Sequence, residues 1–288
     1  MNKPSIGWIG LGNMGIPMCK NIMKNGYALT VFNRTKEKEK PLTEAGASTV
    51  ERPALLLLKC DIVFTMVSDD EAAKEVYVGK DGLLSKNEAK PKLIINTSTL
   101  SPETSKGLAA QCSDKGVEYL EAPVSGSVKP AEDAALIILC SGPEEVFEKA
   151  KPVLECLGKK VMHLGDWGAA SVAKLAINLL VGFTVQGLAE TVLFAQHHGI
   201  DKEQMLQIIN EGGCGNATTK AKTPSILSGD FTPSFTVKNY AKDLRLAKGV
   251  GVETPMANAV FETYQNALKE YENEDLMAVI QFLDKEEK

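Results

Sequence analysis

The sequence has few of the side chains that bind metal ions or form disulfide frameworks. Only three of its 288 residues are histidines, and the six cysteines include no Cys-x-x-Cys pair and show no regular spacing. Zinc and iron–sulfur sites need several such ligands at characteristic spacings, so a metal centre is not expected. We expect the cysteines to be buried thiols in a reducing compartment, because several stand in apolar runs such as 137–140.

Long runs of one charge are also lacking. The formal net charge is −5 at pH 7, and no run of Lys and Arg is longer than two residues. Nucleic-acid and membrane-surface partners usually require clustered positive charge, so neither is expected. No signal-peptide pattern precedes the first apolar run, which favours a cytoplasmic protein. The hydrophobic share of 44% and the charged share of 24% are typical of a soluble globular chain.

Hydrophobic patterning divides the chain into two halves. Up to about residue 165, short strand-like apolar runs alternate with helical patterns, whereas only helical patterns follow. The alternation predicts an α/β fold with a Rossmann-type, doubly wound sheet. We therefore predict a first domain over 1–165 and an all-helical domain over 166–288, with a long helix at 168–198 between them. The predicted strands cover 5–10, 28–32, 61–67, 93–96, 117–120, 136–140 and 160–164. The helices predicted after the long one cover 202–211, 218–227, 239–248, 255–271 and 275–283.

A glycine-rich motif lies between the first predicted strand and a helical pattern that runs to Lys24. Its form is G-x-G-x-x-G and a second strand follows, which is the context of the dinucleotide-binding fingerprint. In that fingerprint the first glycine permits a tight turn, the second lets the backbone approach a pyrophosphate, and the third lets helix and strand pack closely. The helix N-terminus adds free N–H groups for the phosphates. The predicted cofactor-binding residues here are Gly10, Leu11, Gly12, Asn13, Met14 and Gly15.

The residues after the second predicted strand indicate which nicotinamide cofactor is bound. Where an NAD-binding protein usually has an acid for the ribose hydroxyls, this chain has Asn33, Arg34 and Thr35, with no acid before Glu37. Arg34 can bind a 2′-phosphate, and Asn33 and Thr35 can add neutral hydrogen bonds. We therefore predict NADP(H) as the cofactor. The alternative is a solvated arginine in a turn.

Two further predicted strands, 61–67 and 93–96, end in small polar residues. Ligands of an open parallel sheet collect at the carboxyl ends of its strands. We therefore expect the cofactor cleft to be lined by Met66, Val67, Ser68 and Thr99.

The long apolar helix carries a lysine and an asparagine, Lys174 and Asn178, in an i, i+4 relation. Such neighbours lie on one helix face, so the amine and the amide point the same way. These two residues, with Gln186 and Glu190, also argue against a membrane span. Taken alone, Lys174 could be a lysine whose stem lies on apolar surface while its amine reaches water.

Four blocks of sequence together resemble the β-hydroxyacid dehydrogenase family over nearly the whole chain. They are GLGNMG at 10–15, APVSGS at 122–127, GAASVAKLAIN at 168–178 and KDLRLA at 242–247. The resemblance implies a Rossmann domain joined by a long helix to an all-helical domain. It also implies the reduction of small semialdehydes or 2-oxo acids, or the oxidation of the corresponding hydroxy acids. The chain departs from the family at Ile177, since many members have two consecutive asparagines where this chain has Ile177 and Asn178.

The resemblance further implies roles for individual residues. Lys174 is implied as the catalytic lysine, with Asn178 as its helper. The substrate carboxylate is implied to bind at Ser125, Gly126 and Ser127. The implied cofactor contacts are Thr99 and Lys242, and the residues implied near the substrate pocket are Phe235 and Asp243.

These observations favour an NADPH-dependent reductase of small carboxylate-bearing aldehydes. Residues 127–139 are more similar to the succinic semialdehyde and glyoxylate reductase branch than to the 3-hydroxyisobutyrate branch. Protonated Lys174 would donate a proton to the carbonyl oxygen as hydride reaches the carbon. The alternatives are a 3-hydroxyisobutyrate-type dehydrogenase working toward oxidation, an imine reductase, which Lys174 disfavours, and a cofactor-binding module without turnover. The apolar runs 181–183 and 192–194 predict a homodimer or homotetramer.

Overall fold

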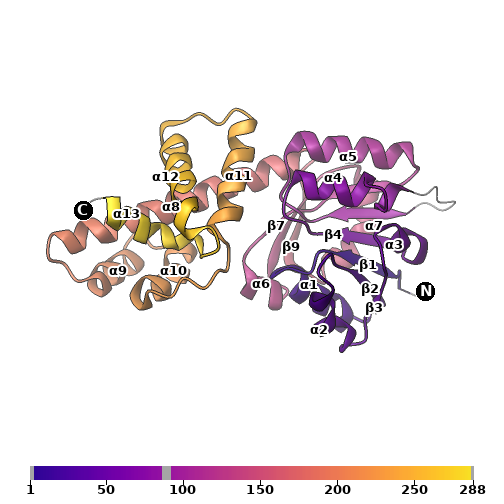
Figure 1. Ribbon diagram of the computed structural model, residues 1–288, viewed down its shortest axis with the longest axis horizontal. Helices are drawn as coiled ribbons and strands as arrows, with labels where there is room; N and C mark the ends of the chain where they lie inside the picture. The colour runs from indigo at the N-terminus through magenta and orange to yellow at the C-terminus, as the bar shows by residue number, and fades with distance from the viewer. Residues whose placement is uncertain (1–2, 86–91, 287–288) are drawn as a thin grey trace. The chain divides into compact units, whose positions relative to one another are not determined.

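The computed structural model describes residues 3–85 and 92–286. It separates into two compact units, Met1–Lys174 and Leu175–Lys288. The long helix α8 (Ala169–His197) contributes residues to both, and its bounds differ from the predicted 168–198 by one residue at each end. The predicted domain boundary at 165 lies just before α8, whereas the compact units divide within that helix. Each unit is drawn in its own part of the colour ramp in Figure 1.

The first unit is built on a parallel sheet of six strands in the order β3-β2-β1-β4-β5-β6. Sheet order reverses beside β1, as in dinucleotide-binding folds, so the predicted Rossmann-type class is confirmed. Strands β1, β4 and β5 are buried along their whole length, which explains why they read as continuous apolar runs. The strands are β1 (Ile6–Ile9), β2 (Leu29–Phe32), β3 (Ser48–Thr49), β4 (Ile62–Thr65), β5 (Leu93–Asn96) and β6 (Glu118–Glu121).

Helices cover both faces of this sheet. They are α1 (Gly15–Lys24), α2 (Lys40–Thr43), α3 (Ala54–Lys59), α4 (Asp70–Val78), α5 (Pro102–Asp114) and α7 (Glu144–Leu154), with short 3-10 turns at Lys36–Glu39 and Leu83–Ser85. Successive strand residues point to opposite faces. Trp8 and Phe64 stack with 4.9 Å between ring centroids in a core shared with α1 and α7. Ile9 and Val63 belong to the other core, shared with α3, α4 and α5. Figure 1 shows α4 and α5 on one side of the strands and α1 on the other.

A second, three-stranded sheet follows in the order β7-β8-β9. Its elements are β7 (Val124–Ser125), α6 (Val128–Glu132), β8 (Leu136–Cys140) and β9 (Gly158–His163). The strands predicted at 136–140 and 160–164 are therefore present, but they do not extend the large sheet. The reason is that β7 pairs with β8 in the antiparallel sense, and an antiparallel bridge joins Glu121 to Ser141. The chain thus turns back at the end of β6 instead of crossing over.

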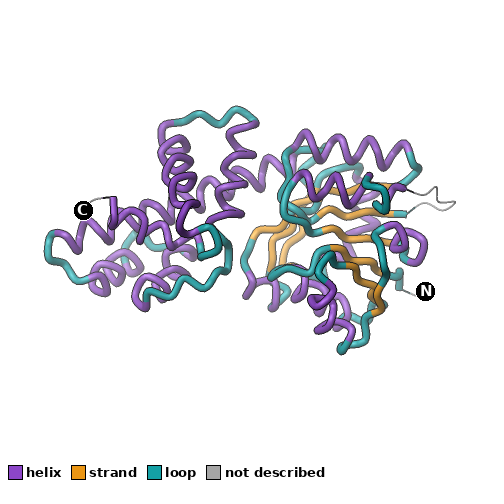
Figure 2. Tube along the Cα trace, viewed as in Figure 1, coloured by secondary structure: helices purple, strands orange, loops and turns teal. Residues whose placement is uncertain are grey.

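In the part of the chain described after residue 175, the second unit consists of helices joined by loops, with one isolated antiparallel bridge between Thr236 and Asp275 (Figure 2). Besides α8 it contains α9 (Lys202–Glu211), α10 (Ala217–Ser228), α11 (Val237–Gly249), α12 (Pro255–Tyr271), a 3-10 turn at Leu276–Ala278 and α13 (Val279–Glu286). Several helices begin at a side-chain cap, including Asp201 before α9 and Asn216 before α10. The core collects Val185 and Val192 of α8 with Tyr240 of α11 and many other apolar residues.

Helix α8 is the one helix of residues 3–85 and 92–286 that is long and apolar enough to cross a membrane by length and composition. A buried helix in a protein core meets the same criteria. Val185, Leu188, Val192 and Leu193 of α8 are buried in the helical core, so much of its apolar character serves packing within the unit.

The predicted burial of the cysteines is confirmed for four of them and is wrong for Cys214. Cys19, Cys60, Cys112 and Cys140 are buried, Cys156 is half-buried, and Cys214 is exposed. Burial raises the pKa of Cys112 and that of Cys140 to about 12, so both remain neutral thiols. Cys214 lies in the loop between α9 and α10, where no core forms around it.

Candidate active site

In the glycine-rich turn, there is room for a side chain at Gly12 but not at Gly10 or Gly15. At Gly10, with φ of +98°, an added Cβ would collide with the backbone carbonyl of Met66, and at Gly15 it would collide with that of Gly10. Trp8 Nε1 donates to the same Gly10 oxygen at 3.0 Å. At Gly12, by contrast, no heavy atom lies within 4 Å of an added Cβ. The turn is thus tight against the sheet and open at its middle glycine, which fits a pyrophosphate over the start of α1.

Asn33 connects this turn to the residues after β2. Its side-chain oxygen accepts from Leu11 N at 2.9 Å, and its side-chain nitrogen donates to Thr35 O at 2.8 Å. The Asn33 backbone N donates to Glu39 Oε1 at 2.8 Å. The neutral hydrogen bonds predicted for Asn33 are therefore made inside the protein, and they fix the two cofactor loops relative to each other. The Leu11 side chain is buried, and its N–H is used by Asn33.

Glu39 is a residue of this region that sequence reasoning missed. Its carboxylate is buried and also accepts from Lys36 Nζ at 3.0 Å. The only signal in the sequence is an acid a few residues after the second strand, which does not reveal that a 3-10 turn folds it back onto Asn33. Arg34 and Thr35 remain exposed beside this framework, where a 2′-phosphate could reach them.

The residues after β4 are hydrogen-bonded both to the residues after β5 and to the end of β1. Ser98 Oγ accepts from Val67 N at 2.9 Å, and Met66 N donates to Ile9 O at 2.8 Å. Met66, Val67 and Thr99 are half-buried, whereas Ser68 is exposed and donates to Asp69 Oδ2 at 2.7 Å. The predicted cleft residues therefore gather at one edge of the sheet.

Asp70 also organises this edge and was not predicted. Its carboxylate accepts from Ser101 N at 2.9 Å, from Ser101 Oγ at 2.6 Å and from Thr104 Oγ1 at 2.9 Å. These bonds hold the loop that carries Thr99 against the start of α4. A single acid after a strand gives no sequence signal for such a distant partner.

The serine block lies on β7 and the start of α6. Ser125 and Ser127 are half-buried, and Gly126 between them has φ of +133°. A Cβ at Gly126 would lie 2.7 Å from Leu136 Cδ2 and 3.1 Å from Pro130 Cβ, so the turn requires glycine. The block therefore offers two hydroxyl groups around a tight turn, which suits the binding of a carboxylate.

Lys174 is half-buried on α8, in a helix whose first turn is bonded to the end of β6. Glu121 accepts from Gly168 N at 2.6 Å through Oε1 and from Ser171 N at 3.2 Å through Oε2. Ser141 Oγ accepts from Ala170 N at 3.1 Å and donates to Glu121 at 2.8 Å. Glu121 comes directly before the block 122–127 in the sequence, and its role was not predicted.

In the helical unit, Asn178, Asp243 and Lys242 form one connected group. Asn178 Nδ2 donates to Asp243 Oδ2 at 2.5 Å, and Lys242 Nζ lies 2.7 Å from Asp243 Oδ1. Asn178 and Asp243 are buried. Three residues that the sequence singled out separately are thus brought together, and the carboxylate fixes the orientation of the Asn178 amide.

Tyr240 lies near Asp243 of this group and packs against Phe235. The Phe235 ring meets that of Tyr240 edge-on with 5.8 Å between centroids. The Tyr240 hydroxyl is buried and has no hydrogen-bond partner among the described residues. Burial raises the pKa of Tyr240 well above its ordinary value, and nearby Asp243 raises it further, so the phenol stays neutral.

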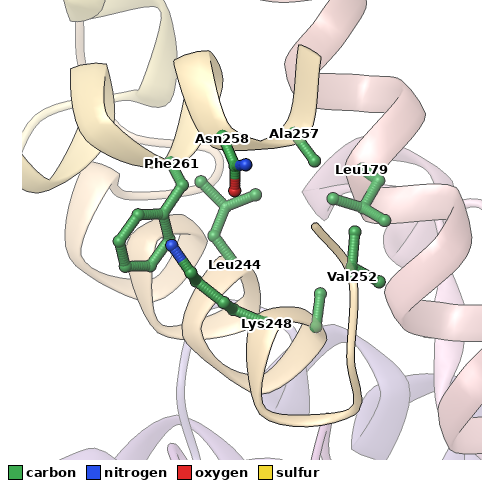
Figure 3. Close-up of a pocket in the computed structure, with 8 residues that line it drawn as sticks. Leu179, Leu244, Lys248, Val252, Ala257, Asn258 and Phe261 are labelled. Carbon is green, nitrogen blue, oxygen red and sulfur yellow. The ribbon is translucent and has the colours of Figure 1, made fainter. Parts of the chain in front are cut away.

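Two hollows in the described residues are lined by residues other than the predicted site residues. A small cavity of about 10 Å³ in the helical unit is at the lower limit for one water molecule (Figure 3). Figure 3 shows Lys248 beside the ring of Phe261, and its Nζ lies 4.4 Å from the ring centroid. The cavity is lined by Leu179, Leu244, Ala247, Lys248, Val252, Ala257, Asn258 and Phe261. An open hollow of about 550 Å³ in the first unit is lined by Pro102, Lys106, Leu164, Asp166, Trp167, Gly168, Ala169, Val172 and Ala173.

Two family models match the chain. One describes the NAD binding domain of 6-phosphogluconate dehydrogenase and matches residues 5–165. The other describes the NAD-binding region of NADP-dependent 3-hydroxyisobutyrate dehydrogenase and matches residues 168–283. The chain belongs to the β-hydroxyacid dehydrogenase family. It is an NAD(P)-dependent oxidoreductase, and the predicted family, enzyme class and nicotinamide cofactor, NADP(H), are confirmed.

Known relatives resemble the chain over most of its length. Glyoxylate/succinic semialdehyde reductase 2 of Arabidopsis thaliana, a chloroplastic protein, is 38% identical over 97% of this chain and 79% of its own. The mitochondrial 3-hydroxyisobutyrate dehydrogenase of Mus musculus is 34% identical over 99% of this chain and 89% of its own. The solved structure of Psf3 in complex with NADP+ and 2-OPP has a TM-score of 0.90 at 26% identity, covering 96% of this chain and 99% of that one.

Proposed function

We propose that this β-hydroxyacid dehydrogenase reduces small carboxylate-bearing aldehydes with NADPH, with succinic semialdehyde or glyoxylate as substrate. The observation that carries the proposal is the polar face of α8, where the half-buried Lys174 precedes the buried Asn178 by one turn. The 38% identity to a glyoxylate/succinic semialdehyde reductase supports this substrate class.

The cofactor contributes hydride at the substrate carbon when it is bound. Lys174, in its ammonium form, hydrogen-bonds the carbonyl oxygen and transfers a proton to it, so that the aldehyde becomes an alcohol. Asn178 lies on the same helix face and is held by Asp243, and it orients the reacting oxygen. The hydroxyls of Ser125 and Ser127 bind the substrate carboxylate, which fixes the other end of a short substrate.

The test compares turnover of C2 to C5 semialdehydes and 2-oxo acids by the wild type and by Lys174→Ala, with NADPH and with NADH. We expect the wild type to prefer a semialdehyde or glyoxylate with NADPH. We expect Lys174→Ala to lower kcat by about 10²-fold or more, the size of a general acid contribution, with unchanged NADPH binding by fluorescence titration. Near-normal turnover of Lys174→Ala would exclude it as the proton donor.

The second candidate function is oxidation of 3-hydroxyisobutyrate or a related β-hydroxy acid. It is favoured by the 34% identity to a 3-hydroxyisobutyrate dehydrogenase over 99% of this chain. In that direction neutral Lys174 would accept the proton. The same substrate panel distinguishes the two candidates. It compares kcat/KM for the hydroxy acid with NADP+ and kcat/KM for the aldehyde with NADPH, and the two candidates differ in the ratio of these values.

We also infer that the protein is a homodimer or homotetramer. Helix α8 exposes large apolar side chains, with Phe194 at 65%, Leu180 at 60% and Val172 at 51% of their full exposure. Exposed large apolar side chains along one helix support an interaction surface there. We expect Phe194→Glu to lower the mass measured by light scattering, whereas the matched change Gln196→Glu, at another exposed position of α8, leaves it unchanged. A monomeric wild type would contradict the inference.

A further inference from the structure

The side chain of Glu121 is a carboxylate buried completely inside the first unit. Its exposed fraction is 0%, and it stands at the last position of β6. Its oxygens accept four hydrogen bonds, from Gly168 N, Ser171 N, Ser171 Oγ and Ser141 Oγ, at 2.6 to 3.2 Å. A buried carboxylate is unfavourable unless its oxygens are satisfied, so this residue needs its partners on the first turn of α8.

The backbone of Glu121 also binds Ser141, which is one of the partners of its carboxylate. Glu121 N donates to Ser141 O and Ser141 N donates to Glu121 O, both at 3.0 Å. Ser141 Oγ then accepts from Ala170 N at 3.1 Å. The backbone N–H groups of Gly168, Ala170 and Ser171 are therefore all bonded to Glu121 or Ser141. These N–H groups have no partner within the helix, and the positive end of the helix dipole favours the negative charge of Glu121.

This arrangement controls the rotation of α8 about its axis as well as its position. Gly168 N binds Oε1 and Ser171 N binds Oε2, and these two groups are almost one helical turn apart. A helix bonded at two such points cannot turn without breaking one bond. Ser171 binds Glu121 through its N–H and its hydroxyl, and Lys174 is three residues later, so the two side chains lie on the same face of α8.

We propose that Glu121 is a positioning residue that sets the direction of the Lys174 amine. The inference rests on the proposed role of Lys174 as proton donor. The carboxylate acts only through the first turn of α8, and its effect on turnover should disappear when the amine is absent. A residue that merely supports the fold would instead change kcat to the same extent with and without the Lys174 amine.

The test is a double-mutant cycle with Glu121→Gln and Lys174→Ala. Glutamine keeps the size of the side chain but replaces one acceptor oxygen by a donor, so it cannot satisfy both Gly168 N and the donors at Oε2. We expect Glu121→Gln alone to lower kcat by about 10- to 100-fold, as a displaced catalytic group does. In the Lys174→Ala background we expect Glu121→Gln to change kcat by less than about twofold.

Several controls make the cycle decisive. Glu118→Gln changes an acid of the same strand that pairs with Lys149 at the surface, and it should leave kcat unchanged. NADPH affinity should be the same in all variants, because the glycine-rich turn is not altered. If Glu121→Gln does not fold, Ser171→Ala takes its place, both alone and together with Lys174→Ala. This change removes only the hydrogen bond from Ser171 Oγ to Glu121 Oε2.

The outcomes separate this inference from the proposed function. An equal loss of kcat from Glu121→Gln in both backgrounds, with Lys174→Ala itself impaired, overturns the positioning role and leaves Lys174 as proton donor. Unchanged kcat in the single variants Glu121→Gln and Ser171→Ala overturns it as well. Near-normal turnover of Lys174→Ala overturns the proposed function instead.

Discussion

At the scale of single residues, the cofactor loops show what residue types can and cannot predict. The residue types at 33–35 predict a turn that binds a 2′-phosphate, because an arginine replaces the usual acid. They could not predict that Asn33 bonds to Leu11 and Thr35, because its amide could equally have reached the ligand. The buried acids Glu39 and Glu121 and the half-buried Asp70 escaped prediction for the same reason. Each acts on residues that lie close only in the folded chain.

The division of roles between Arg34 and Glu39 gives a prediction. Arg34 is exposed and bears the only charge among 33–35, so Arg34→Ala should weaken NADPH binding by about 10-fold or more, as loss of a charged hydrogen bond does, and hardly affect NADH. Glu39→Gln loosens the Asn33 framework and should weaken both cofactors to a similar extent. Fluorescence titration with each cofactor measures this, with Lys38→Ala as the control at an exposed neighbour. Equal losses of the two cofactors in Arg34→Ala would contradict the assignment.

At the scale of elements, it was easier to predict where helices form than to predict which strands pair with each other. The apolar stretch 168–198 could be predicted as a single helix because helical periodicity is a local property of the sequence. The strands at 136–140 and 160–164 also form, but their membership of a separate sheet depends on the reversal at β7 and the Glu121–Ser141 bridge. Pairing between strands is not local, so periodicity alone could not reveal it.

The glycines inside α8 allow a matched test of packing. An added Cβ at Gly182 would collide with the hydroxyl of Tyr240, whereas at Gly187 it would meet nothing within 4 Å. Gly182→Ala should lower the free energy of unfolding by about 1–3 kcal/mol through overpacking against α11. Gly187→Ala should raise it by about 0.5–1 kcal/mol, because alanine favours the helix. Urea unfolding followed by circular dichroism measures both, and a stabilising Gly182→Ala would contradict the contact.

At the scale of the whole molecule, stability depends on charges in a way that the net charge does not indicate. Lys222 Nζ and Asp275 Oδ1 are 2.6 Å apart with side chains 12% and 2% exposed, and Lys285 and Glu270 are also 2.6 Å apart but both 60% exposed. Asp275 further accepts from Ser234 N and Met277 N, so it holds the loop before α11. The sequence shows four charged residues of similar kind, and only the fold distinguishes the buried pair.

Breaking the buried pair should therefore affect stability, and its dependence on pH, more than breaking the exposed pair. Lys222→Met leaves a buried carboxylate unpaired and should lower the free energy of unfolding at pH 7 by about 3–5 kcal/mol. Lys285→Met breaks the exposed pair and should cause no measurable change. Burial alone would raise the pKa of Asp275, but Lys222 and the hydrogen bonds outweigh it, so its pKa lies below the ordinary value.

Because the folded pKa of Asp275 is depressed, its contribution to stability is complete above the unfolded pKa of about 3.9 and is lost as the pH falls through the lower folded value. The stability difference between the wild type and Asp275→Asn should thus be constant from about pH 5 to 7 and shrink below about pH 4. Urea unfolding of both proteins across this range measures it. A difference that grew on acidification would mean that the carboxyl is protonated more easily in the folded chain, and the network around Lys222 would then not stabilise its charge.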